Sequence, residues 1–110
     1  MIATHVLYNK TIFCYLFVGP PVIVKFVEPK PVPLTKEVQI KCVATGNPPP
    51  KVSLIFNDQP AGSVDGVTVT SSDSEAEIKF KAVMDSFIFC EATNELGRDI
   101  RKIRISVNRK

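Results

Sequence analysis

The chain has 110 residues, which is room for one domain. Its residues are 45% hydrophobic and 23% charged, a balance that excludes a disordered chain and predicts a packed core. The formal net charge of +3 is too mild to predict a nucleic-acid partner, which usually requires a concentrated basic surface.

Residues 1–19 do not share the pattern of the rest, and we treat them as a segment outside the domain. Their apolar run, residues 11–18, is much shorter than the roughly 20 residues of a membrane-spanning helix, so no membrane insertion is expected. Three interpretations remain open: an artefact of the gene model, a signal peptide with a poor cleavage site, or the tail of a preceding domain. The segment holds His5 and Cys14, and Asn9 begins a possible glycosylation sequon.

Residues 20–110 are expected to form the domain, and its first part is rich in proline. Residues 22–27 predict a strand, and residues 31–34 predict a second piece of the same strand. The prolines between them interrupt regular pairing, and proline is tolerated mainly on edge strands. We therefore expect a split first strand at the edge of a sheet.

Alternating apolar residues predict further strands over residues 38–44, 52–56 and 67–70 and around Ile78. Two more strands are predicted, one around Cys90 and one around Ile105. Residues 96–98 predict a hairpin turn. The side chains expected to face the core are Val38, Ile40, Cys42, Ala44, Val52, Leu54, Phe56, Ile78, Phe80, Ile88, Cys90, Ala92, Ile103, Ile105 and Val107.

Two patterns in the chain resemble the immunoglobulin superfamily, most nearly its I-set. The first, Cys-x-Ala-x-Gly-x-Pro-x-Pro-x-(Ile/Val)-x-Trp, is matched in register by Cys42, Ala44, Gly46, Pro48, Pro50 and Val52. The second, Cys-x-Ala-x-Asn-x-x-Gly, is matched by Cys90, Ala92, Asn94 and Gly97. The resemblance covers about residues 20–110. It implies an all-β, immunoglobulin-like sandwich of two antiparallel sheets, joined by a disulfide between Cys42 and Cys90. Free core thiols are the alternative.

The chain departs from the family pattern at two places. Leu54 stands at the position of the core tryptophan, and the chain has no tryptophan. Ile88 stands at the tyrosine position two residues before Cys90, and Asp85 is shifted by one residue from the family's aspartate. Without a phenolic hydroxyl at position 88, the tyrosine-corner hydrogen bond cannot form. We therefore expect a domain that folds, with a looser corner.

The same alternation places Ile55, Phe87 and Phe89 outward on one sheet. An exposed apolar cluster on a rigid sheet is typical of a protein-binding surface. The alternative is a register slip of one residue, which would turn both phenylalanines inward and Ile88 outward.

Lys102 and Arg104 are also expected to face outward, on the last long strand. Two basic residues on one face could bind an acidic ligand such as a sulfated glycan. The alternative, which we favour, is a charged edge strand that blocks unwanted pairing.

The sequence offers no catalytic, metal or cofactor site. A single terminal histidine cannot complete a catalytic triad, and the cysteine spacing does not suit zinc. Glu75 and Glu77 share a strand face, which is far more often a solvated face than an acid–base pair.

The resemblance therefore implies a non-catalytic recognition or spacer module of a multi-domain cell-surface or secreted protein. Its partner would be a protein, bound homophilically or heterophilically, and tandem domains of the same type are expected beside it. The alternative is an intracellular, muscle-type scaffold module whose cysteines stay reduced.

Overall fold

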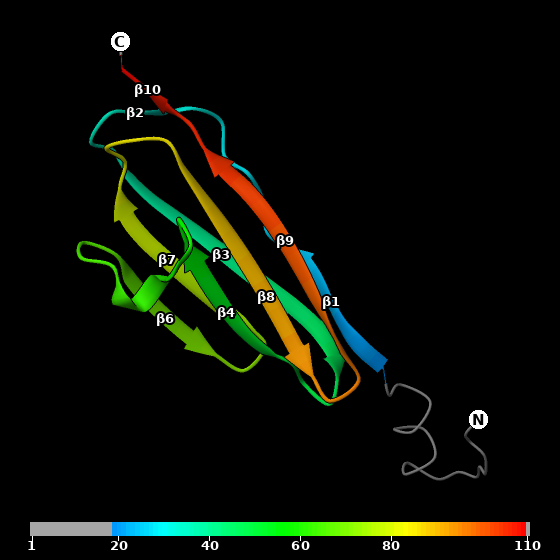
Figure 1. Ribbon diagram of the computed structural model, residues 1–110. Helices are drawn as coiled ribbons and strands as arrows, with labels where there is room; N and C mark the ends of the chain where they lie inside the picture. Colours follow the sequence, from blue (N-terminus) through cyan, green and yellow to red (C-terminus); the bar gives the residue numbers. More distant parts are fainter. Residues whose placement is uncertain (1–18, 110) are drawn as a thin grey trace, which may run out of the picture.

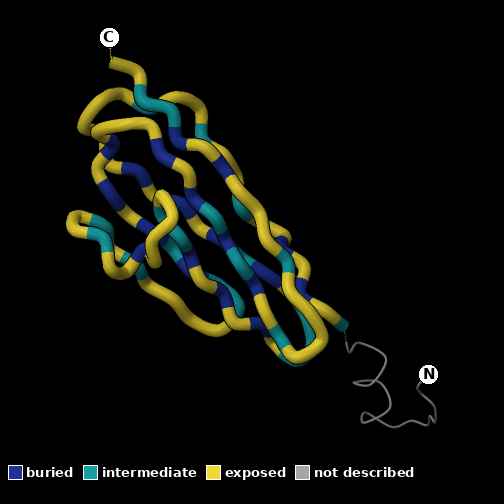
Figure 2. Tube along the Cα trace, in the orientation of Figure 1, coloured by how far each residue is buried: buried dark blue, intermediate teal, exposed yellow. Residues whose placement is uncertain are grey.

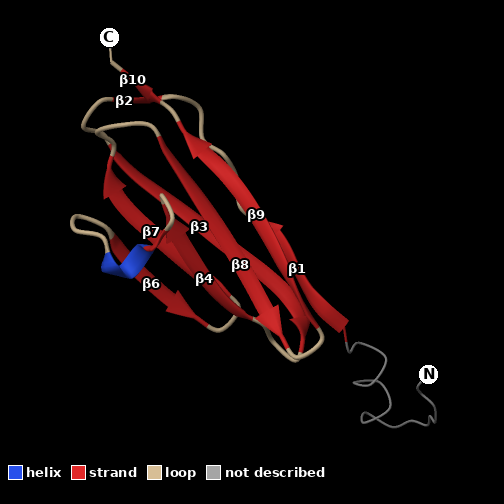
Figure 3. Cartoon of the chain, viewed as in Figure 1, coloured by secondary structure: helices blue, strands red, loops and turns tan. Residues whose placement is uncertain are grey.

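The computed structural model describes residues 19–109, which form two layers of β-sheet (Figure 1, Figure 3). The elements in chain order are β1 (Gly19–Lys25), β2 (Val32–Pro33), β3 (Glu37–Asn47), β4 (Lys51–Phe56), β5 (Gln59–Pro60), the 3-10 turn η1 (Ala61–Ser63), β6 (Thr68–Ser72), β7 (Glu75–Lys81), β8 (Ser86–Asn94), β9 (Gly97–Ile105) and β10 (Val107–Asn108). One layer has the strand order β1-β3-β7-β6 and the other β5-β4-β8-β9, and all pairs in both are antiparallel. The predicted all-β sandwich is confirmed.

The first strand is split into two pieces, β1 and β2, as the prolines predicted. Strand β1 is the edge strand of the first layer, beside β3. The chain then crosses over, and β2 pairs with β10 in a short parallel ladder near the C-terminus (Figure 1). The Val32 N–H donates to the Ser106 carbonyl at 2.9 Å. Proline has no backbone N–H to donate, and the prolines of the crossover lie where no hydrogen bond to a neighbouring strand is needed.

Buried and exposed residues alternate along β3, β7 and β8 (Figure 2). This alternation arises because one face of each strand packs on the core and the other meets water. The rings of Phe56 and Phe80 meet edge to face at the margin of the core, with centroids 5.0 Å apart. The buried apolar residues are Ile23, Val38, Ile40, Cys42, Ala44, Val52, Leu54, Ala61, Ala76, Ile78, Phe80, Ala82, Ile88, Cys90, Ala92, Ile103 and Ile105.

Asn94 fastens the end of the sandwich at which β1 begins. Its side-chain amide donates to the Gly19 carbonyl at 3.0 Å and to the Pro48 carbonyl at 2.9 Å. Its side-chain oxygen accepts the Leu96 N–H at 2.8 Å. A Cβ at Gly46 would lie 3.2 Å from the backbone of β1, so glycine permits the close approach of β1 to β3. Asn94 and Gly46, which belong to the two sequence patterns, therefore hold together the start of β1, the loop at Pro48 and the turn after β8.

Strand boundaries differ from the predicted ones by a few residues. Strand β1 begins and ends earlier than the predicted 22–27, because Gly19 pairs with Asn47 and the chain leaves the sheet after Lys25. Strand β6 runs from Thr68 to Ser72 and so extends two residues beyond the predicted 67–70. The predicted hairpin near residues 96–98 is present, with Asn94 paired to Gly97.

Several predictions fall outside the described residues. They concern the sequon at Asn9 and the three interpretations of the leading segment, which also holds His5 and Cys14.

Candidate functional site

A disulfide between Cys42 of β3 and Cys90 of β8 joins the two layers. Both cysteines are fully buried, and the predicted pairing is confirmed. Leu54 of β4 lies opposite Cys90 in the β4–β8 ladder and is 5% exposed. An aliphatic side chain therefore stands beside the bridge at the position where the family has tryptophan. The bridge and the core around it hold β8 rigidly, and the outward side of β8 carries the candidate site.

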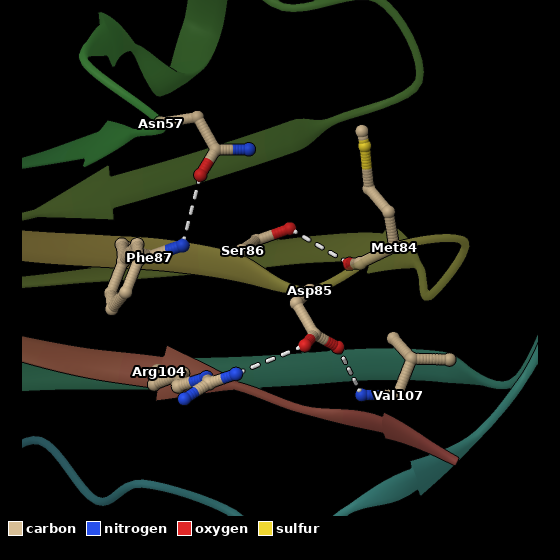
Figure 4. Close-up of polar contacts among 7 residues, drawn as sticks. All are labelled: Asn57, Met84, Asp85, Ser86, Phe87, Arg104 and Val107. Atoms are coloured by element: carbon tan, nitrogen blue, oxygen red, sulfur yellow. Dashed lines mark hydrogen bonds and ion pairs between the residues drawn. The ribbon is translucent and has the colours of Figure 1, made fainter. Parts of the chain in front are cut away.

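The corner before β8 is held by hydrogen bonds that replace the missing tyrosine (Figure 4). Ser86, which is buried, donates its hydroxyl to the Met84 carbonyl at 3.1 Å. Asp85 accepts the Val107 N–H at 2.8 Å with one carboxylate oxygen and binds the Arg104 guanidinium at 3.1 Å with the other. The expectation that a tyrosine corner cannot form holds, but the corner has its own polar contacts. Sequence reasoning noted the shift of Asp85 and missed its role.

Asn57 fixes the start of β8 from the opposite side. Its backbone N–H donates to the Phe87 carbonyl at 3.0 Å, and its side-chain oxygen accepts the Phe87 N–H at 2.9 Å (Figure 4). Phe87 is 43% exposed, whereas Ile88 is fully buried. The strand has therefore not slipped in register, and the alternative that turned the phenylalanines inward is wrong.

The pairing register of β4, β8 and β9 brings the predicted apolar surface residues and the predicted basic surface residues together on one face. Phe89 lies between Ile55 of β4 and Lys102 of β9, and Phe87 lies opposite Arg104. We call these five residues the aromatic–basic patch. Side chains directly opposite each other in an antiparallel ladder touch, so the apolar and basic residues form one surface. The sequence placed each set outward, but only the pairing register shows that they are neighbours.

Lys102 binds the faces of both aromatic rings. Its ammonium nitrogen lies 5.0 Å from the centroid of the Phe87 ring and 5.9 Å from that of the Phe89 ring. Both distances are within the range at which a cation is attracted to the negative face of a ring. The ammonium therefore sits at the centre of the patch, and its N–H groups remain available for hydrogen bonds.

Two ion pairs lie on the same face, and one of them includes Arg104 of the patch. Arg104 pairs with Asp85 at one end, and Arg98 pairs with Glu91 at 3.1 Å toward the other. Ile100 lies opposite Glu91, shares the outward face of β9 with Lys102, and is 46% exposed. Sequence reasoning missed Ile100, although its spacing of two from Lys102 was the available signal.

The two glutamates considered as an acid–base pair lie on the outer face of the other layer. Glu75 forms an ion pair with Lys41 at 3.0 Å, and Glu77 accepts a hydrogen bond from the Gln39 side chain. The hydrogen bond that Lys41 donates to the Glu75 carboxylate raises the pKa of Lys41. Each carboxylate thus has a neighbour of its own on β3, which is the arrangement of a solvated strand face.

Residues 19–109 contain no group of His, Cys, Asp and Glu side chains that could hold a metal ion. Over the same range, no helix is long and apolar enough to cross a membrane.

Comparison with known proteins identifies the family. The sequence profile of the immunoglobulin I-set domain matches residues 21–107. The chain belongs to the immunoglobulin I-set family. This I-set domain is 30% identical to mouse Hemicentin-2 (Mus musculus) over 76 residues, which is 68% of the chain and 2% of that protein. The chain thus spans a very small part of the curated relative that it matches.

Solved structures agree with this I-set fold. A chimeric titin Z1Z2 superposes with a TM-score of 0.74 at 20% identity, covering 84% of the chain and 97% of the titin chain. The N-terminal Ig1-2 module of the Drosophila receptor protein tyrosine phosphatase DLAR superposes with a TM-score of 0.72 at 20% identity, covering 84% of the chain and 50% of that module. At this identity the likeness shows the fold alone.

Asp85 is expected to make the stability of the I-set domain sensitive to acid. The hydrogen bond from Val107, and then the Arg104 guanidinium, lower the pKa of the Asp85 carboxyl. A lowered folded-state pKa means that the charged carboxylate stabilises the fold above the unfolded-state value of about 4, and that this contribution is lost as the pH falls through the lowered value. Asp85→Asn should therefore be less stable than wild type at neutral pH and should approach it in acid. Urea unfolding across this pH range measures the difference.

The control for this prediction is Asp73→Asn, which removes a carboxylate from the exposed turn at the other end of β7. Its stability difference from wild type should change less with pH than that of Asp85→Asn. Equal pH profiles for the two variants would show that Asp85 has no special role at the corner.

Proposed function

We propose that the chain is a non-catalytic protein-recognition module of a multi-domain extracellular or cell-surface protein, and that it binds through the aromatic–basic patch. The observation that carries this proposal is the exposed phenylalanine Phe87, held outward beside Phe89 on a strand that the disulfide ties to the core. Aromatic residues on a rigid surface are the usual energetic centres of protein interfaces, because they bury a large area at little entropic cost.

The disulfide supports the extracellular compartment. Disulfides persist in oxidising environments and are rare where the cytosol keeps thiols reduced. The resemblance in fold to titin domains leaves an intracellular scaffold module as the second candidate, in which Cys42 and Cys90 stay reduced. Non-reducing mass analysis of the native protein separates the two. A mass lower by two hydrogens, with Cys42 and Cys90 recovered in one linked peptide, supports the extracellular compartment; free thiols at both positions support the scaffold.

Replacing Phe87 and Phe89 together with serine is expected to abolish partner binding and leave the fold intact. The loss of unfolding free energy should stay under about 2 kcal/mol, below the roughly 3–5 kcal/mol that truncating a buried phenylalanine costs. Circular dichroism with urea unfolding measures the stability. Binding is measured by panning a displayed library of fragments from secreted proteins against the full chain and against the variant.

The matched control is the double replacement of Val22 and Val24 with serine. These residues are 48% and 57% exposed on β1, at the edge of the other layer. Fragments selected on wild type should keep their affinity for the valine variant and lose it for the phenylalanine variant. Collapse of the fold in the phenylalanine variant, or equal binding by both variants, would contradict the proposal.

A further inference from the structure

We propose that the patch binds a different protein, not a second copy of this chain, and that the partner presents a carboxylate beside an apolar side chain, with Lys102 receiving the carboxylate. This inference rests on the proposed function, because it names the chemistry of the partner at the same face. It depends on how the charges around the aromatic rings are paired.

Lys102 differs from the two arginines of the face because it has no carboxylate partner in the described part of the chain, and it differs from Lys51 because it lies over the aromatic rings. Arg104 is paired with Asp85 and Arg98 with Glu91. Within residues 19–109, Lys102 is in no ion pair, and its ammonium lies over the two phenylalanine rings. A ring face attracts a cation without neutralising its charge or accepting its hydrogen bonds in the way that a carboxylate does. The charge of Lys102 is therefore the one at the centre of the patch that a partner can neutralise.

The charge of the whole face argues against self-association. Basic side chains outnumber acidic ones on this face, with Lys51, Arg98, Lys102 and Arg104 against Glu91 and Asp85. Two copies related by a two-fold axis would set this face against itself, so that each Lys102 approached the basic side chains of the other copy. Like charges in contact are costly at an interface, and an acidic surface is attracted to the same face. The pairing of charges therefore favours a heterophilic partner.

The exposed rings argue for a protein surface over a sulfated glycan. A glycan sulfate needs clustered cations that are free to bind it, and two arginines of this face already hold carboxylates. The ring of Phe87 and the side chain of Ile100 are 43% and 46% exposed, and a sulfate group does not cover apolar area of this kind. A partner with an apolar side chain next to its carboxylate covers the rings and neutralises Lys102 at the same time.

The test selects random short peptides, displayed on phage, against the full 110-residue chain. Selected peptides are expected to combine Asp or Glu with a neighbouring aromatic or aliphatic residue. Their affinity should fall about tenfold or more for Lys102→Gln, weaken with added salt, and largely survive in Lys102→Arg. Lys79→Gln is the matched control, because it removes the same charge from the outer face of β7 and should leave the affinity unchanged.

The outcomes separate this inference from the proposed function. Peptides that lose binding to the Phe87→Ser and Phe89→Ser double variant, but bind Lys102→Gln as well as wild type, would support the recognition face and overturn the acidic partner. Peptides that bind elsewhere, or no peptides at all, would overturn both. Binding of a heparin oligosaccharide that survives the double phenylalanine replacement and is lost in Lys102→Gln would assign Lys102 to a glycan and overturn the inference. Dimerisation of wild type in sedimentation equilibrium that Lys102→Gln alters would assign the face to a second copy, with the same consequence.

Discussion

Replacing Cys42 and Cys90 together with alanine is expected to lower the free energy of unfolding by about 4 kcal/mol. The bridge joins residues separated by 48 positions, so removing it releases a long loop of the unfolded chain and raises the entropy of that state. The variant also loses packing, because both sulfurs are fully buried between the layers. Urea unfolding followed by far-ultraviolet circular dichroism measures the change, since the chain has no tryptophan to report by fluorescence.

The control for the cysteine variant is wild type unfolded in the presence of a reductant. Reduced wild type should lose most of the same stability, because it lacks the same cross-link. The double variant should not respond to the reductant. A wild type whose unfolding midpoint is the same with and without reductant, and equal to that of the variant, would show that the bridge contributes nothing to the fold.

The sequence predicted most of the core, because the strand signal is local. Phe56 and Val107 are only partly buried, and the buried residues Ile23, Ala61, Ala76 and Ala82 were not predicted. A period of two, together with two cysteine-centred patterns, placed Ile88, Cys90 and Ala92 inward, and these residues are buried. Strand ends were less predictable. They depend on contacts between distant segments, such as the bond from Asn94 to the Gly19 carbonyl that starts β1 early.

The candidate site was only half predictable from the sequence. The alternation of apolar residues predicted that Phe87 and Lys102 point outward. Whether they are neighbours depends on the pairing register of β8 and β9, which the alternation does not give. The role of Asp85 at the corner could not be predicted for the same reason. Its two partners lie on β9 and β10, at 19 and 22 positions along the chain, and no local pattern brings them together.

The loss of the tryptophan makes Leu54 the second sensitive point of the core. Leu54 is 5% exposed and lies opposite Cys90, so it fills the space beside the disulfide. Leu54→Ala should lower the free energy of unfolding by about 3 kcal/mol, within the roughly 2–5 kcal/mol range for buried leucines, because it removes buried apolar surface and leaves a cavity. The same urea titration measures it, with the disulfide intact.

Two comparisons sharpen this prediction. Val24→Ala is the control, because Val24 is 57% exposed and its truncation should change stability by only about 0.5 kcal/mol. Leu54→Trp restores the family residue into a core already closed around leucine, and overpacking should cost about 1–3 kcal/mol. If Leu54→Trp were more stable than wild type, the space beside Cys90 would be underfilled by leucine. A loss in Leu54→Ala no larger than that of Val24→Ala would show that leucine does not replace the missing indole.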